Sequence, residues 1–356
     1  MELCSFVLSD PANRPGPTRP PAVVTDLHTV VRNGWYNAFT DLVYWKDYYW
    51  LAYRRGTGHH HERSLPLRTG NSQVVVLRSN DLTRWQEAQV FVSPYGYAGG
   101  GGLADGHFCA ADDRLYLWTS DRVWTADRRI IAPTHVAWTQ DGMAWTVQQP
   151  TRIGDSHTNV FRARFHDGRF HAAVAGGDDA LLLIASDDAV HWTEQARIAG
   201  PGPGFCSESD LHWLPDGRLW CVVRVNGPAL FYQAEPPYTR FSGPTELARR
   251  CDAPVMCETG GQVYLGGRCP VPNSPCGTTG LYRMRPQGPA ELILALPPAG
   301  DAAYQGLISL EPGKLIMSYY SDFAYWSGLI KPRHFDRFRF KMTDCDIFVA
   351  EIDVAA

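Results

Sequence analysis

The feature that most constrains the fold of this chain is a hairpin pattern that occurs six times. Each copy has a run of alternating apolar and polar residues, a short polar turn and a second alternating run. The copies span residues 37–54, 104–120, 159–175, 208–224, 252–268 and 304–320, and successive turns are 44 to 66 residues apart. Four-stranded units of about 40–50 residues are typical of β-propellers. The chain is therefore predicted to be all-β, with one six-bladed β-propeller.

The remaining strands and the N-terminal segment fit the same interpretation. The runs at residues 23–31 and 344–354 alternate as strands do, so we expect the first to close the ring and the second to complete the last blade. The Pro-rich residues 1–21 are interpreted as an N-terminal arm, and residues 22–356 as a single propeller domain.

Composition agrees with this fold and excludes several classes of function. The 356 residues include 33 Gly and 26 Pro, which suit many tight turns, and the net charge is only −4. A nucleic-acid-binding protein needs a clustered excess of Lys and Arg residues. A membrane span needs about 20 consecutive apolar residues. The sequence has neither feature. The N-terminus is a poor signal peptide, so we expect a cytoplasmic protein, with secretion left open if a leader has been removed.

A second motif follows three of the apolar strands. It reads Ser or Thr, one residue, Asp, three residues and Trp, and it occurs at Ser79–Trp85, Thr139–Trp145 and Ser186–Trp192. The Asp accepts hydrogen bonds from turn amides in such motifs, and the Trp packs between sheets. We interpret these turns, which resemble the Asp-boxes of sialidases, as structural.

The hairpin register brings charged and phenolic side chains to one end of the strands. Residues equally far before and after a hairpin turn are cross-strand neighbours, which pairs Glu208 with Arg224, Asp252 with Arg268, and Tyr304 with Tyr320. Arg54 has the matching place in the first hairpin. One such pair is explained by an ordinary salt bridge, but a converging set of guanidinium groups favours an anionic ligand, because arginine binds carboxylates in a bidentate manner.

At these residues the chain resembles the sialidase superfamily. The resemblance rests on Glu208 followed by Arg224, on Arg268 in the next hairpin, and on the segment from Tyr304 to Tyr320. It implies that Tyr304 is the nucleophile that attacks the anomeric carbon, with Glu208 as its base, because a phenol needs an adjacent base. It also implies that Arg224 and Arg268, with Arg54, hold the carboxylate of the sugar.

The chain departs from the sialidase pattern at two places. The first arginine motif of sialidases is replaced by Tyr36–Phe39, and the loop that should carry the acid/base Asp contains His59 and His60 instead. A histidine can serve as a general acid/base, so His59 and His60 are predicted to have this role. Further candidates for substrate binding are Asp105, Arg162, Asp252 and Tyr320.

The sequence thus predicts an exo-acting glycoside hydrolase that releases a terminal acidic sugar, such as sialic acid or a related ulosonic or uronic acid. Two alternatives stay open: a polysaccharide lyase that acts on uronates through a His/Tyr pair, and a glycan-binding propeller without catalysis. The expected partner is a carbohydrate with a carboxylate, and no nucleic acid or membrane. No cofactor or metal is expected, and the protein is predicted to be a monomer or a simple homo-oligomer.

Overall fold

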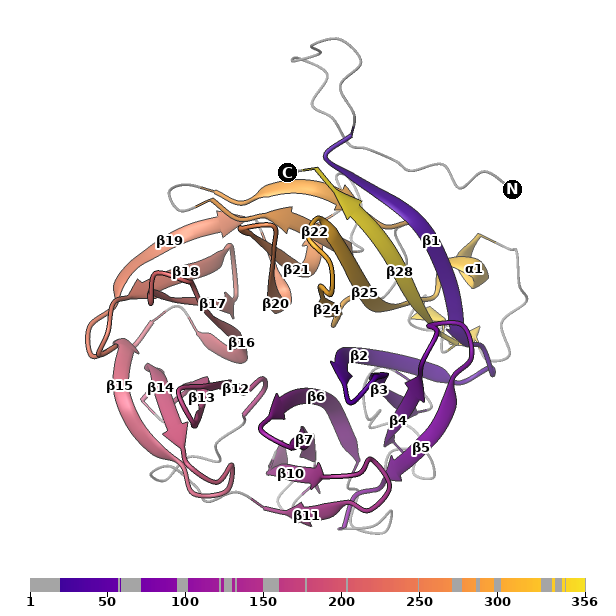
Figure 1. Cartoon of the computed structure of the whole chain (residues 1–356), viewed down its shortest axis with the longest axis horizontal. Coiled ribbons are helices and arrows are strands. Elements are labelled where there is room, and N and C mark those ends of the chain that lie inside the picture. Colours follow the sequence, from indigo (N-terminus) through magenta and orange to yellow (C-terminus); the bar gives the residue numbers. More distant parts are fainter. Residues whose placement is uncertain are drawn as a thin grey trace.

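The strands of this protein form blades around a central axis, as Figure 1 shows. The structure is a computed structural model. It describes residues 20–56, 58, 72–94, 102–121, 123–124, 130–131, 133–149, 160–176, 178–202, 204–248, 250–270, 277–285, 289–297, 302–327, 335–336, 341–342 and 344–355. Within these ranges there are six four-stranded antiparallel sheets. The predicted six-bladed β-propeller is confirmed.

Each of the first three blades takes its strands from one stretch of chain, with the innermost strand first. Blade 1 consists of β2 (Tyr36–Trp45), β3 (Tyr48–Gly56), β4 (Gln73–Ser79) and β5 (Gln86–Phe91). Blade 2 consists of β6 (Leu103–Ala111), β7 (Arg114–Asp121), β10 (Thr134–Thr139) and β11 (Thr146–Gln148). Blade 3 consists of β12 (Arg164–His166), β13 (Arg169–Ala175), β14 (Leu181–Ser186) and β15 (Thr193–Ala199).

The other three blades follow in chain order, and the last takes one strand from the start of the chain. Blade 4 consists of β16 (Phe205–Trp213), β17 (Leu219–Val225), β18 (Ala229–Ala234) and β19 (Ser242–Ala248). Blade 5 consists of β20 (Asp252–Thr259), β21 (Gln262–Pro270), β22 (Gly277–Arg283) and β23 (Glu291–Ala295). Blade 6 consists of β24 (Gly306–Ile308), β25 (Lys314–Ser321), β28 (Asp346–Val354) and β1 (Ala22–Val31).

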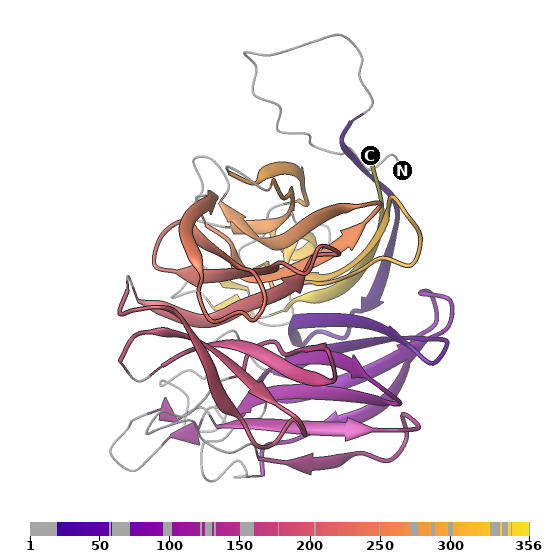
Figure 2. The ribbon, with the colours of Figure 1, turned by 60° about the vertical axis from the view of Figure 1, so that its left-hand side comes forward.

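Among the residues that the structure describes, two short strand pairs and one short helix lie outside the blades. They are the strand pair β8 (Val123–Trp124) with β9 (Ile130–Ile131), the pair β26 (Phe335–Asp336) with β27 (Lys341–Met342), and the helix α1 (Phe323–Trp326). No helix in the described part of the chain is long and apolar enough to cross a bilayer. Figure 2 shows the blades obliquely, turned by 60° about the vertical axis from the view of Figure 1.

The ring is closed by the first strand of the chain. Strand β1 pairs antiparallel with β28, from Ala22 opposite Val354 to Val31 opposite Ile347. The prediction that residues 23–31 close the ring and that residues 344–354 supply a strand of the last blade is confirmed. Residues 1–19 of the predicted arm lie outside the described residues, so the domain limits stay a prediction.

The hairpin turns and the Asp-box turns have the local geometry that their residues dictate. In the β12–β13 turn, Asp167 and Gly168 both have positive φ, at 47° and 77°, which suits the Asp-Gly dipeptide. In the Asp-box between β14 and β15, Asp188 Oδ1 accepts hydrogen bonds from the backbone N–H groups of Val190 and His191. The Trp192 indole N–H donates to the Ala189 carbonyl. These contacts give the motif a structural role.

Two buried carboxylates link the blades at the axis. Asp41 of blade 1 accepts hydrogen bonds from the Arg162 guanidinium at 2.8 Å and from the Phe108 N–H of blade 2 at 2.7 Å. Asp210 of blade 4 accepts two from Arg164 of blade 3, at 2.8 and 2.6 Å, and one from the Met256 N–H of blade 5 at 2.6 Å. We call Asp41, Arg162, Arg164 and Asp210 the axial ion pairs.

Asp41 is kept ionised by its partners in the axis. Burial alone would raise the pKa of Asp41, but the contributions of Arg162 and His107 together outweigh it and hold the pKa well below the usual range. Arg162 also donates to the Gln305 carbonyl of the segment before β24, at 3.5 Å. The axial ion pairs and their backbone partners therefore connect all six blades.

Replacing Arg162 with Met should destabilise the fold strongly, because Asp41 would stay buried without its charged partner. Loss of one partner of a buried pair costs about 3–5 kcal/mol. Urea unfolding of the wild type and Arg162→Met measures the change in free energy. Arg285→Met is the control, since the Arg285–Glu291 pair is exposed and should contribute much less. Equal losses in the two variants would contradict the role given to Arg162.

Candidate functional site

Five of the residues predicted for the site come together at one end of the axis. Glu208 lies on β16, Arg224 on β17, Asp252 on β20, Arg268 on β21 and Tyr304 just before β24. These residues come from blades 4, 5 and 6, and a continuous series of hydrogen bonds and ion pairs links their side chains. We call these five residues the charged cluster.

The phenol of Tyr304 donates a hydrogen bond to Glu208. The distance from the phenolic oxygen to Glu208 Oε1 is 2.5 Å, across 96 residues of sequence. Burial raises the pKa of Tyr304 well above its usual value of 10, and the neighbouring negative charges of Glu208 and Asp105 raise it further. The phenol is therefore neutral at physiological pH, and its proton points at a carboxylate oxygen.

Glu208 receives two further donors that fix its carboxylate. Arg224 donates to the same oxygen, Oε1, at 2.5 Å, and the backbone N–H of Ala253 donates to Oε2 at 2.8 Å. Burial alone would lower the pKa of Arg224, but the carboxylates of Glu208 and Asp252 outweigh it and raise the pKa. Both oxygens of Glu208 thus have donors, and the carboxylate is held in one orientation.

Asp252 is fully buried and contacts three guanidinium groups. Its Oδ1 lies 3.0 Å from Arg224 Nε, and its Oδ2 lies 3.4 Å from Arg268 Nη1. The third partner is Arg250, whose Nε and Nη2 reach the two oxygens at 2.8 and 2.7 Å. The sequence analysis missed Arg250 because it lies in the loop before β20, outside the strands whose register was used.

Kinks in the innermost strands shape the site. Phe39, Ala253 and Tyr304 have positive φ, at 57°, 52° and 51°, which is rare for residues other than glycine. The strand pairing shifts beside two of them, between Ala38 and Asp41 and between Asp252 and Val255. Such bulges reorient side chains near active sites. Here one kink presents Tyr304, and another directs the Ala253 N–H to Glu208.

Aromatic rings hold the Tyr304 ring from two other blades. The Phe39 ring lies 4.4 Å from the Tyr304 ring, centroid to centroid, and the Phe161 ring lies 5.9 Å away. Contacts between tilted rings at these distances are favourable. The phenol of Tyr304 therefore has a fixed position relative to Glu208.

Three other predicted site residues lie around this aromatic group. Arg54 is 2% exposed, and its guanidinium lies 5.4 Å from the centre of the Phe39 ring, on blade 1. Tyr320 is fully buried, 5.7 Å from the same ring, and is therefore not exposed to a sugar in this structure. Asp105 of β6 is 8% exposed, and its charge acts on Tyr304.

Arg162 is not brought to the charged cluster. Arg162 is 2% exposed and belongs to the axial ion pairs. His59 and His60 lie outside the described residues, so their role as acid/base stays a prediction.

One group of side chains has the composition of a metal site. It consists of Asp26, His28 and Glu351, whose ligand atoms all lie within 4.8 Å of one another. The group lies on β1 and β28, the two outer strands of blade 6, and includes no member of the charged cluster. The chemistry of the candidate site therefore uses no residue of this group.

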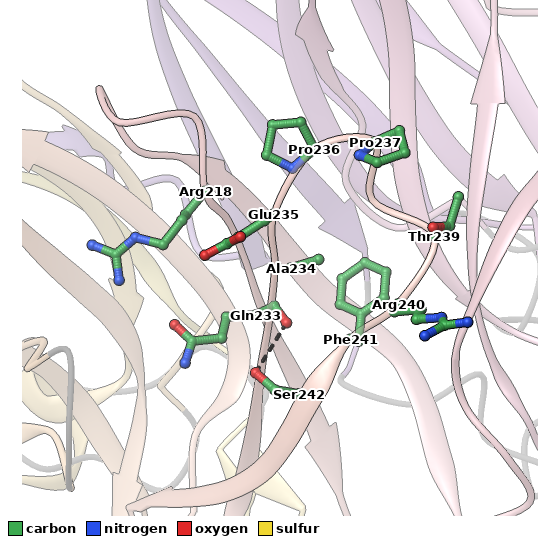
Figure 3. Close-up of a pocket in the computed structure, with 10 residues that line it drawn as sticks. All are labelled: Arg218, Gln233, Ala234, Glu235, Pro236, Pro237, Thr239, Arg240, Phe241 and Ser242. Atoms are coloured by element: carbon green, nitrogen blue, oxygen red, sulfur yellow. Dashed lines mark hydrogen bonds between the residues drawn. The ribbon is translucent and has the colours of Figure 1, made fainter.

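A surface pocket of about 540 Å³ lies at the opposite end of blade 4 from Glu208 and Arg224. Figure 3 shows that the β18–β19 connection and Arg218 line it, with Pro236, Pro237 and Phe241 among the lining side chains. Arg218 directly precedes β17, whereas Arg224 is near the end of that strand. The pocket is thus separate from the charged cluster.

Comparison with known proteins relates the chain to glycoside hydrolases. The model of the glycosyl hydrolases family 32 N-terminal domain matches residues 28–213. A sucrose-6-phosphate hydrolase from Bacillus subtilis (strain 168) is 23% identical over 200 residues, which are 53% of this chain. The match spans only 39% of the length of that relative.

Solved structures show the same fold at low identity. A protein of unknown function from Dyadobacter fermentans DSM 18053 has a TM-score of 0.76 and 16% identity, with 95% of this chain and 100% of that chain covered. The endosialidase of phage phi92 has a TM-score of 0.68 and 10% identity, with 95% and 70% covered. The Trypanosoma rangeli sialidase has a TM-score of 0.59 and 12% identity, with 94% and 60% covered.

The structural similarity confirms a sialidase-like propeller fold, and the sequence match covers more than half of the chain. The protein therefore belongs to the family defined by the N-terminal domain of glycosyl hydrolases family 32.

Proposed function

We propose that this protein is a retaining, exo-acting glycoside hydrolase whose substrate is a terminal sugar with an anionic group. The hydrogen bond from the Tyr304 phenol to Glu208 carries the proposal, because it pairs a nucleophile with a base. Membership of a glycosyl hydrolase family and the name of the matched relative support a hydrolase.

In the proposed first step, the Tyr304 oxygen attacks the anomeric carbon and the phenolic proton passes to Glu208. The glycosidic bond breaks, and a general acid protonates the leaving oxygen. In the second step the general acid, now deprotonated, takes a proton from a water molecule that attacks the same carbon; the bond to Tyr304 breaks, and Glu208 returns its proton to the tyrosine oxygen. Two displacements at one carbon retain the anomeric configuration. The general acid is predicted to be His59 or His60.

The charges around Tyr304 support an anionic substrate. The charged side chains named above around Tyr304 comprise four guanidinium groups and three carboxylates, which is an excess of one positive charge: Arg54, Arg224, Arg250 and Arg268, with Glu208, Asp252 and Asp105. Guanidinium groups bind carboxylates and phosphates. The predicted substrate carries a carboxylate, as sialic or uronic acids do, and a sugar phosphate is the alternative suggested by the similarity to a sucrose-6-phosphate hydrolase.

The two alternative functions have less support. A lyase reaction through a His/Tyr pair needs a histidine at the tyrosine, whereas the Tyr304 phenol bonds to a carboxylate. A glycan-binding module without catalysis does not require a nucleophile in contact with a base, so it does not explain the contact between Tyr304 and Glu208. Both alternatives are outcomes of the experiments below.

Replacing Tyr304 with Phe should lower kcat by on the order of a thousandfold or more, since the nucleophilic oxygen is lost. The assay uses a panel of sialosides, uronides, sugar phosphates and neutral fructosides. Proton NMR of the first-formed product of the wild type should show a retained anomeric configuration.

Inversion, or full activity in Tyr304→Phe, would overturn the proposed mechanism. An unsaturated product with ultraviolet absorbance would identify a lyase instead. Binding of an acidic sugar without any turnover would identify a glycan-binding propeller. Preference for the neutral sugars of the panel would contradict the anionic substrate.

Replacing Glu208 with Gln should lower the pKa of Tyr304, because a negative charge beside the phenol is removed. In the wild type, Tyr304 should stay protonated through pH 10, its usual pKa. Ultraviolet titration of ionised tyrosine measures this, with each protein compared with its own Tyr304→Phe variant. An unchanged Tyr304 titration in Glu208→Gln would contradict the contact.

A further inference from the structure

We propose that Thr40 is a positioning residue for Tyr304, so that blade 1 orients the nucleophile that blade 6 supplies. The inference rests on the proposed function for its kinetic consequence, whereas the contacts themselves do not depend on it. Thr40 lies on β2, 264 residues before Tyr304 in the sequence.

The backbone of Tyr304 needs an external restraint. Its φ of 51° is in the left-handed region, which a residue with a Cβ atom rarely adopts. Tyr304 also precedes β24, which begins at Gly306, so the pairing of β24 with β25 does not include it. Contacts from outside the blade must therefore keep this residue in its strained conformation.

Thr40 supplies such contacts at the carbonyl group of Tyr304. Its backbone N–H donates to this carbonyl at 3.0 Å, and its hydroxyl donates to the same oxygen at 2.7 Å. Thr40 is fully buried, so water does not compete for these bonds. Both lone-pair directions of the Tyr304 carbonyl are thus used by one residue of another blade.

The hydroxyl of Thr40 is itself held by blade 6. Ser318 of β25 donates its hydroxyl proton to Thr40 Oγ1 at 3.0 Å, and the Gly306 N–H donates to Ser318 Oγ at 3.0 Å. The hydrogen bonds therefore run in one direction, from the Gly306 N–H to Ser318, from Ser318 to Thr40 and from Thr40 to the Tyr304 carbonyl. Because Thr40 Oγ1 accepts from Ser318, its own proton is directed to Tyr304.

Blade 1 also contacts the other part of Tyr304. Phe39, the neighbour of Thr40, packs its ring against the Tyr304 ring at 4.4 Å. Glu208 of blade 4 binds the phenolic oxygen. The backbone and ring of Tyr304 are thus held from blade 1 and its oxygen from blade 4. A small displacement of a reacting group lowers the rate steeply, because the near-attack geometry is lost.

The test compares Thr40→Val, Thr40→Ser and a matched control in the full chain. Thr40→Val keeps the shape and the backbone N–H but removes the hydroxyl, so kcat should fall by about 10- to 100-fold, with KM changed by less than about twofold. Thr40→Ser restores the hydroxyl and should recover most of the rate. The assay uses whichever glycoside of the panel the wild type hydrolyses.

Thr259 offers the matched control. It is also a nearly buried threonine that links two blades: its hydroxyl donates to the Glu311 carbonyl of blade 6 and accepts from Ser309. It ends β20, at the turn end of that strand, whereas Asp252 begins the strand at the site. Thr259→Val should lose stability as Thr40→Val does, and it should keep the wild-type kcat.

A second measurement needs no substrate. Crystal structures of the wild type and Thr40→Val should show that the distance from the Tyr304 oxygen to Glu208 Oε1 exceeds hydrogen-bond range only in the variant. An unchanged contact, equal rate losses in Thr40→Val and Thr259→Val, or no rescue by Thr40→Ser would overturn the proposal. If the wild type hydrolyses no glycoside but the contact is lost in Thr40→Val, the proposed function fails and the positioning role stands.

Discussion

The propeller depends on the pairing of charges inside its axis. Asp41 and Asp210 are buried, and a buried carboxylate is stable only when it is paired and hydrogen-bonded. Each finds an arginine from blade 3 and a backbone N–H from a neighbouring blade. These partners come from different blades, so the requirement fixes the blades relative to one another. A ring held only by apolar contacts between sheets lacks such directional constraints.

This fixed centre explains how a precise site forms at one end of the axis. The members of the charged cluster come from blades 4, 5 and 6, and none of these blades has the arrangement alone. The kinks at Ala253 and Tyr304 direct an N–H group and a phenol to one carboxylate, Glu208. Strained backbone of this kind persists only where the surroundings determine it fully.

Much of the architecture is predictable because propeller hairpins repeat. Alternation and turn residues identify the blades, and the pairs Ala38–Arg54 and Asp252–Arg268 occur as expected. Pairing residues at equal distances from the turn gives the correct partners at the open end of these hairpins for an unexpected reason. Nearer the turn the ladder is offset by one residue, with Trp45 opposite Tyr48, and the bulge in β2 restores the expected alignment at the open end.

The parts that were not predictable depend on contacts between blades. The hydrogen bond from Thr40 to Tyr304 joins residues of blades 1 and 6 that no hairpin register relates. Arg162 was expected at the substrate because it lies at the start of the third hairpin, but its guanidinium pairs with Asp41, two blades away. Alternation assigns a side chain to a face of its sheet, and it does not say which distant blade that side chain meets.

The closure of the ring by β1 and β28 has a consequence for synthesis. His28 of β1 bonds to Glu351 of β28, 323 residues later. At about 5–20 residues per second, roughly 15 to 65 s separate the appearance of these two strands at the ribosome. During that time β1 has no partner edge, and an unpaired strand is open to association with other chains. The polar side chains of Asp26 and His28, two residues apart on β1, make such association less favourable in the nascent chain as well as in the finished ring.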